Sequence, residues 1–154
     1  MIDTPVQVKT EKQATAAIRL TMPRADIQKY MEPAIHELMA TLAAQGIGPV
    51  GPLSSYHFHI DTAMFDFEVC IPVSKAISPV GRVINSALPA TTVMRTNYHG
   101  PYENLGEAWG QFHAAIGTDK GCETGGLWEC YIKGPESSPD PAQWITQLNQ
   151  PLQP

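Results

Sequence analysis

Two glutamates lie in the middle of apolar, strand-like segments, where a carboxylate is unexpected. Glu129 lies in the stretch GGLWECYIKGP, between Trp128 and Cys130, and Glu68 lies in FDFEVCIPV. Burying an unpaired charge is costly, so a carboxylate in such a segment needs a partner or a function. A carboxylate among aromatic rings suits a cationic or polarised organic ligand, and a partly desolvated glutamate can also serve as a general acid or base.

Strand alternation indicates which side chains accompany each glutamate. In GLWECYIKG, Glu129 and Tyr131 share one face. The other face is apolar and is expected to pack on a helix; it carries Trp128, Cys130 and Ile132. In FDFEVCIPV, Glu68 lies opposite a face that is also expected to pack on a helix; that face carries Phe65, Phe67, Val69 and Ile71. The alternative for both glutamates is a solvated sheet face, which is common in antiparallel sheets.

Aromatic residues favour a ligand pocket over a solvated face for Glu129. Tyr131 shares its face, and Tyr56 and Tyr98 lie on neighbouring candidate strands. An apolar pocket with a few polar anchors is typical of small-molecule sites. The predicted ligand-binding residues are Glu129, Tyr131, Tyr56, Glu68, Tyr98 and His99.

The elements that hold these residues follow from hydrophobic periodicity. A strand pattern covers residues 6–21, and a helical period then runs over residues 24–45. Pro33 predicts a break in this helix, with a short first helix ending near Met31 and Pro33 in the first turn of the main helix. The segments that follow are strands at about 53–59 and 64–73, an edge strand within 81–89, a strand at 91–98, a helix between Pro101 and Gly117, and strands in GGLWECYIKGP and WITQLNQPL.

The order strand, helix, strand, strand occurs twice, which indicates an internal duplication with a pseudo-two-fold axis. The repeats cover about residues 6–75 and 80–152 of a single domain, 1–154. In this interpretation FDFEVCIPV matches GLWECYIKG, so that Glu68 corresponds to Glu129.

The gross composition excludes several classes of protein. The formal net charge of −5 disfavours direct binding to nucleic acid, since proteins that grip phosphates by themselves are normally basic. The first residues lack the apolar core of a signal peptide, and the longest apolar runs are too short to span a bilayer. We therefore expect a cytoplasmic chain that has no membrane contact and needs no cofactor.

Other residues with reactive side chains have simpler interpretations. His57 and His59 have the spacing of a metal pair, but only Asp61 or His99 offers a third ligand, so a pocket-rim pair is favoured and no metal is predicted. His99 lies at a strand-to-helix corner, where a hydrogen bond that stabilises the turn is favoured over a role in polarising a ligand.

The cysteines and two of the tryptophans are interpreted as structural. Cys70, Cys122 and Cys130 lack the C-x-x-C spacing of a zinc site and do not form a disulfide framework. Trp109 and Trp144 are expected to be packing residues.

The segments FDFEVCIPV, YHGPYENL, GLWECYIKGP and DPAQWITQLNQPL together resemble the GyrI-like domain. This is the effector-binding domain of multidrug-responsive AraC- and MerR-type regulators, and it also occurs as free-standing proteins. The resemblance covers about residues 6–152. It implies an α+β fold in which a duplicated β-α-β-β repeat forms a concave antiparallel sheet, with two helices packed on one face and a ligand groove near the pseudo-two-fold axis.

The resemblance also implies a function. In the family the central acidic residue of the pocket comes from the strand that matches LWECY, which makes it Glu129 here. We expect a stand-alone protein that binds hydrophobic, cationic or aromatic compounds for sensing, sequestration or detoxification. No helix-turn-helix precedes the domain in this sequence, so direct control of transcription is disfavoured.

Two alternatives accompany this expectation. Some free-standing members resemble this chain but hydrolyse cyclopropane-bearing genotoxins with a pocket glutamate and tyrosine, for which Glu129 and Tyr98 are the candidates, with Tyr56 or Tyr131 in place of Tyr98. Another member is associated with the protection of DNA gyrase. A separate regulator or a topoisomerase is thus the class of protein partner that the resemblance implies.

Overall fold

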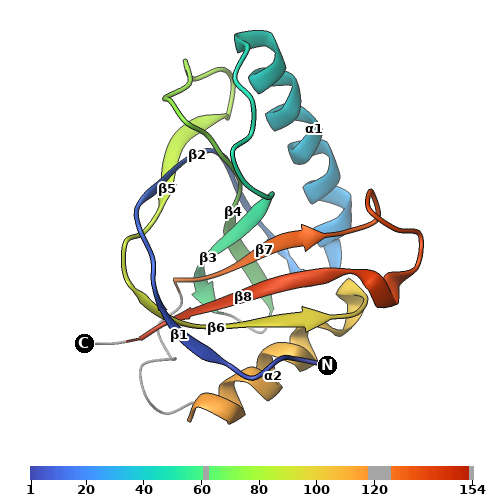
Figure 1. Cartoon of the computed structure of the whole chain (residues 1–154). Helices are drawn as coiled ribbons and strands as arrows, with labels where there is room; N and C mark the ends of the chain where they lie inside the picture. The colour runs from blue at the N-terminus through green and yellow to red at the C-terminus, as the bar shows by residue number, and fades with distance from the viewer. Residues whose placement is uncertain (61–62, 118–125, 153–154) are drawn as a thin grey trace.

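The computed structural model describes residues 1–60, 63–117 and 126–152 (Figure 1). The elements within these ranges are β1 (Val6–Lys9), β2 (Gln13–Pro23), α1 (Ile27–Gln45), β3 (Ser54–Ile60), β4 (Met64–Pro72), β5 (Ile84–Leu88), β6 (Thr92–His99), α2 (Leu105–Ile116), β7 (Leu127–Lys133) and β8 (Ile145–Pro151). Each helix is preceded by a short 3-10 turn. No helix in the described residues combines the length and the apolarity needed to cross a bilayer.

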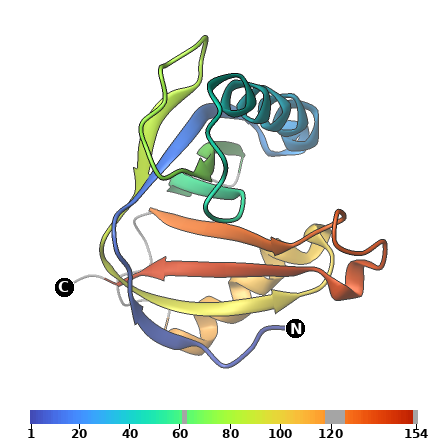
Figure 2. The ribbon, with the colours of Figure 1, turned by 45° about the horizontal axis from the view of Figure 1, so that its top comes forward.

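One antiparallel sheet contains all eight of these strands, in the order β1-β6-β8-β7-β3-β4-β2-β5. The units β2-α1-β3-β4 and β6-α2-β7-β8 follow the same path in the two halves of the sheet, and the halves meet where β3 pairs with β7. The predicted α+β fold with a repeated β-α-β-β unit is confirmed. Figures 1 and 2 show α1 beside one half and α2 beside the other.

The two helices cover the same face of the sheet, which we call the helix face. In one half, α1 packs on β2 and β4 through Ala34 and Leu38, which meet Ile18 and Val69 in a buried cluster. In the other half, α2 packs on β6 and β8, where its residue Phe112 lies in a cluster with Tyr98 and Leu148. The strand pairing places all of these strand residues on one side of the sheet.

On the opposite face, which we call the concave face, side chains from distant strands of the sheet pack against one another. Its buried cluster combines residues from both ends of the sheet: Ala17, Cys70, Leu88, Val93, Trp128 and Cys130, with Val8 and Tyr56 packed against them. Such distant strands meet only if the sheet curves toward this face. Where the chain passes between β1 and β2, the Thr10 hydroxyl donates to the carbonyl oxygen of Pro89 at 2.8 Å, which joins the two edges of the sheet.

The single strand expected over residues 6–21 is two strands in the structure. β1 pairs with β6 at one end of the sheet, while β2 pairs with β4 and β5 at the other end. The β-prone composition runs through both strands, so it does not reveal where the chain crosses between the two ends.

Pro33 does not divide the first helix, so the prediction of two helices meeting near Met31 is wrong. A single helix, α1, runs through Pro33. A proline inside a helix removes one backbone hydrogen bond and crowds the preceding turn. Ala34, next to Pro33, and Leu38, one turn further along, are fully buried against the sheet. This packing stabilises the helix around the proline.

The predicted correspondence between Glu68 and Glu129 is also wrong. Glu129 lies on β7, whose equivalent in the other half is β3, whereas Glu68 lies on β4, whose equivalent is β8. The local similarity of FDFEVCIPV and GLWECYIKG reflects the common composition of buried strands and does not reflect equivalent positions.

Candidate ligand-binding site

Glu129 lies in a row of side chains that crosses the helix face. The register places the following residues side by side from β6 to β2: Thr96, Leu148, Glu129, Ser55, Val69 and Ile18. Leu148 packs under α2, and Val69 and Ile18 pack under α1. Glu129 therefore lies between the areas that the two helices cover, where the halves of the sheet meet.

This position contradicts the expectation that Trp128, Cys130 and Ile132 pack on a helix. Trp128 and Cys130 belong to the cluster on the concave face, and Ile132 is 43% exposed. Alternation along β7 correctly groups Glu129 with Tyr131. It does not say which group meets the helices, because both faces of this strand carry large apolar side chains.

Both carboxylate oxygens of Glu129 accept a hydrogen bond. The indole Nε1–H of Trp109, on α2, donates to Oε2 at 2.6 Å, and the hydroxyl of Tyr131 donates to Oε1 at 2.9 Å. The Ser55 hydroxyl lies 2.8 Å from the Tyr131 hydroxyl. Because Tyr131 donates its proton to Glu129, the Ser55 hydroxyl is the donor in this second hydrogen bond. Burial and the charge of Glu129 raise the pKa of Tyr131 well above 10, so this hydroxyl remains a donor.

Glu129 is buried, with 8% of its surface exposed, and no cation pairs with it in the described part of the chain. Its two donors are neutral groups. They offset part of the cost of burying the carboxylate but leave its full negative charge uncompensated.

Aromatic rings surround this charge. The ring of Tyr102, just before α2, meets that of Tyr131 edge-on at 5.7 Å between centroids, and it also contacts Trp144 at 4.9 Å. His57 lies two residues from Ser55 on the same face of β3, diagonally across from Glu129.

His57 is buried and stacks on Phe67 at 5.1 Å. Burial lowers the pKa of His57; the charge of Glu129 opposes this shift and that of Arg24 adds to it. The guanidinium of Arg24 lies over the ring of Phe65 at 4.4 Å. The imidazole is therefore neutral near pH 7.

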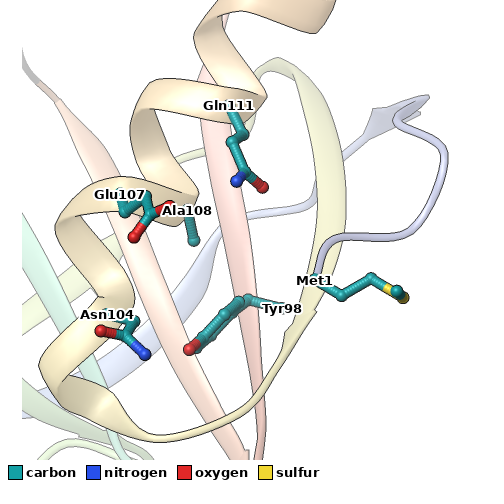
Figure 3. Close-up of a pocket in the computed structure, with 6 residues that line it drawn as sticks. All are labelled: Met1, Tyr98, Asn104, Glu107, Ala108 and Gln111. Carbon is teal, nitrogen blue, oxygen red and sulfur yellow. The ribbon is translucent and has the colours of Figure 1, made fainter.

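Tyr98 is on the helix face but belongs to a different environment. It is buried under α2, and its hydroxyl donates to the carbonyl oxygen of Pro101 at 2.9 Å. It also borders a small polar cavity of about 140 Å³ beside α2, and Figure 3 shows the side chains of Asn104 and Gln111 around that cavity. Tyr131, and not Tyr98, is thus the tyrosine bonded to Glu129.

Tyr56 and Glu68 lie on the concave face, away from Glu129. Tyr56 stacks on Trp128 with 5.9 Å between ring centroids, and Glu68 accepts a hydrogen bond from the Ser86 hydroxyl at 2.6 Å. The pairing of β2 with β4 places Arg19 next to Glu68, so a positive charge lies beside this carboxylate.

His99 is at an exposed strand end, where its Nε2 lies 3.1 Å from a carboxylate oxygen of Asp3. The six predicted residues therefore do not form one site. Asp61, Cys122 and the side chain of His59 lie outside the described residues.

Sequence reasoning missed Trp109, Ser55 and Tyr102 as neighbours of Glu129. Trp109 is on the sheet-facing side of α2, three residues before Phe112, which fits the packing role expected for it. A further signal was available, because a buried indole N–H needs an acceptor. Ser55 and Tyr102 carry no comparable signal.

Comparison with known proteins agrees with this architecture. The C-terminal domain of EcmrR has a TM-score of 0.80 and 22% identity, over 97% of this chain and 96% of that domain. The chain spans 57% of the EcmrR chain in its complex with DNA, with 20% identity and a TM-score of 0.83.

Two more distant structures share the fold. SAV2435 bound to tetraphenylphosphonium has 11% identity and a TM-score of 0.70, over 97% of this chain and 93% of that one. A hydrolase from Listeria innocua has 13% identity and a TM-score of 0.68, over 97% and 92%.

No curated protein sequence matches the chain. Residues 4–153, however, match the family described as the GyrI-like small molecule binding domain. This match covers almost the whole sequence, and the sheet and helices agree with it. The chain belongs to the GyrI-like family of small-molecule-binding domains.

Proposed function

We propose that this domain binds lipophilic aromatic cations on the helix face, with Glu129 as the counter-ion. One observation carries the proposal: Glu129 is a buried carboxylate with two neutral donors, and it forms no ion pair with any residue that the structure describes. Uncompensated buried charges are costly and concentrate at functional sites. A cationic ligand supplies the missing charge, and the exchange of a neutral donor for a charged one strengthens the interaction.

The surroundings of Glu129 suit an aromatic ligand. The rings of Trp109, Tyr131 and Tyr102 present faces and edges close to the carboxylate. Each ring can contribute a cation–π contact, worth about 0.5–2 kcal/mol depending on desolvation. Charge pairing and ring contacts then act on the same ligand.

Binding requires the carboxylate to exchange a partner. Trp109 and Tyr131 together occupy both oxygens of Glu129, so a cation replaces at least one of these donors. Trp109 is the more readily displaced of the two, since it is on a helix, whereas Tyr131 is two residues from Glu129 on the same strand and also bonds Ser55.

Thermal and chemical unfolding with tetraphenylphosphonium test this proposal. A ligand at one hundred times its Kd raises the free energy of unfolding by about 2.7 kcal/mol. We expect Glu129→Gln to abolish most of this increase and Glu68→Gln, the matched change on the concave face, to preserve it. An unchanged response in Glu129→Gln would refute the role of Glu129.

Hydrolysis in the same site is a second candidate, favoured by the hydrogen-bonded chain from Ser55 through Tyr131 to Glu129. In such a reaction the oxygen of a water adds to a carbon of the strained ring while Glu129 takes the proton of that water. The ring bond that breaks leaves its electron pair on the atom that accepts the proton of the Tyr131 hydroxyl. Mass spectrometry after incubation with a strained-ring electrophile distinguishes the two candidates. Turnover that Glu129→Gln and Tyr131→Phe both abolish supports hydrolysis, whereas recovery of unchanged compound supports binding alone.

A further inference from the structure

A second carboxylate lies near Tyr102, one of the rings beside Glu129. Glu136 is exposed in the connection between β7 and β8, and no cation pairs with it among the residues that the structure describes. Tyr102 contacts the rings of Tyr131, which bonds Glu129, and of Trp144. Their centroid distances are 5.7 Å from Tyr131 to Tyr102 and 4.9 Å from Tyr102 to Trp144.

A glycine lets this carboxylate and the Tyr102 hydroxyl lie close to the backbone. A Cβ added to Gly134 would lie 2.5 Å from the Tyr102 hydroxyl oxygen and 2.9 Å from a carboxylate oxygen of Glu136. Both polar groups therefore share the space above this glycine, which any larger residue would fill.

The Tyr102 hydroxyl experiences both carboxylates. Burial raises the pKa of Tyr102, and the charges of Glu136 and Glu129 raise it further. One aromatic side chain thus connects a buried negative charge with an exposed one, and neither carboxylate forms an ion pair within residues 1–60, 63–117 and 126–152.

We propose that the preferred ligands carry two positive charges, one for Glu129 and the other for Glu136. Their apolar framework lies along the aromatic rings between the two carboxylates. This inference rests on the proposed function and specifies its ligand class as dicationic aromatic compounds, such as bis-amidines. Glu136 is exposed, so its contribution is smaller than that of Glu129.

Matched compounds test the second position. Calorimetric titration compares bis-benzamidines of several linker lengths with the same diaryl compounds from which one amidine has been removed. We expect the best bis-amidine to bind the unmodified protein about three- to tenfold more tightly than its monocationic analogue. Glu136→Gln should remove this difference and leave the affinity for the monocation unchanged.

Glu11→Gln is the control, because it removes the same charge from an exposed position between β1 and β2. It should preserve the preference for the dication. Gly134→Ala provides a second variant, which should reduce the preference by filling the shared space. Circular dichroism and the Tm confirm that each variant is folded.

Three outcomes overturn the inference while leaving the proposed function intact. They are equal binding of the two compounds, a preference that survives Glu136→Gln, and a loss in Glu136→Gln that affects both compounds alike. If neither compound binds, the proposed function fails and this inference fails with it.

Discussion

Glu129 and Glu68 are buried to the same extent, with 8% of each exposed, yet their surroundings differ. Glu68 lies on the concave face beside Arg19, in a row with Tyr56 and Trp128, and accepts a hydrogen bond from Ser86. Glu129 lies on the helix face, where its donors are neutral and no described residue forms an ion pair with it.

This difference supports our proposal that Glu129 binds a ligand and that Glu68 has a structural role. Arg19 bonds Asp66 through two contacts of 2.8 and 2.9 Å, and its position opposite Glu68 on the paired strand places a positive charge near that carboxylate. Among the described residues, Glu129 is bonded by the neutral donors Trp109 and Tyr131. Burial alone therefore does not distinguish the two glutamates, whereas the charge of their neighbours does.

The largest effect is expected from Trp109→Phe, which removes the indole donor to Glu129 and keeps an aromatic ring. A donor to a buried charge contributes about 1.5–3 kcal/mol, so the free energy of unfolding should fall by about this amount. The affinity for tetraphenylphosphonium should rise, because the ligand no longer displaces the indole. Denaturant unfolding and calorimetry measure the two quantities.

Ser86→Ala is the matched change on the concave face, since it removes the donor to Glu68. It should lower stability without changing the affinity for the ligand. If Trp109→Phe lowered the affinity for tetraphenylphosphonium, the indole would contribute to binding and would not compete with the ligand for Glu129.

An intermediate effect is expected at alkaline pH. A tyrosine whose pKa is raised by folding contributes stability that is complete below the unfolded pKa, near 10, and is lost as the pH rises through the folded pKa. The pKa of Tyr131 is raised by burial and by Glu129, and that of Tyr56 is raised by burial and by Glu68.

The shift is the larger one at Tyr131. We therefore expect the loss of stability between about pH 9 and pH 11 to shrink more in Tyr131→Phe than in Tyr56→Phe. At pH 8, Tyr131→Phe should cost about 1.5 kcal/mol, the lower end of the range for a donor to a charged group, because Glu129 loses the longer of its two hydrogen bonds. Unfolding by urea across this pH range measures both effects, and an equal change in the two variants would remove this distinction between the faces.

The smallest effect is expected at acidic pH. Folding lowers the pKa of His57, so its contribution to stability is complete above the unfolded pKa of 6.5 and is lost as the pH falls below that value. His57→Gln should flatten this acid loss, whereas His36→Gln, an exposed change on α1, should not.

The loss of stability at acidic pH should respond differently to Glu129→Gln and Glu68→Gln. The charge of Glu129 favours protonated His57, so Glu129→Gln should enlarge the loss, and Glu68→Gln should leave it unchanged. Equal effects of the two variants would place His57 outside the influence of Glu129.

Much of the fold follows from local patterns, whereas the site depends on pairings between distant strands. Apart from the division of residues 6–21 into two strands and the continuous helix through Pro33, periodicity correctly predicts the order of strands and helices. Alternation correctly groups Glu129 with Tyr131. Alternation does not predict that Glu129 is on the helix face. Trp128 and Cys130, on the other face of β7, are apolar enough to pack against a helix, so the sequence favours the wrong face.

The partners of Glu129 come from separate parts of the chain. Ser55 reaches it through the pairing of β3 with β7, and Trp109 reaches it through the packing of α2 on β6 and β8. Both relations are tertiary, so the residues themselves carry little local signal. The strand register, which pairs Glu129 with Ser55 and places Tyr56 and Glu68 on the opposite face, is tertiary for the same reason.

The tryptophans provide the most direct test of the central claim that ligands bind at Glu129 on the helix face. Trp109 bonds Glu129, Trp128 is buried beside Tyr56 on the concave face, and each has one indole N–H. In a proton–nitrogen correlation spectrum, assigned with Trp→Phe variants, tetraphenylphosphonium should shift the Trp109 indole signal and leave that of Trp128 in place. A shift of Trp128 with an unchanged Trp109 would place the ligand on the concave face and contradict the account.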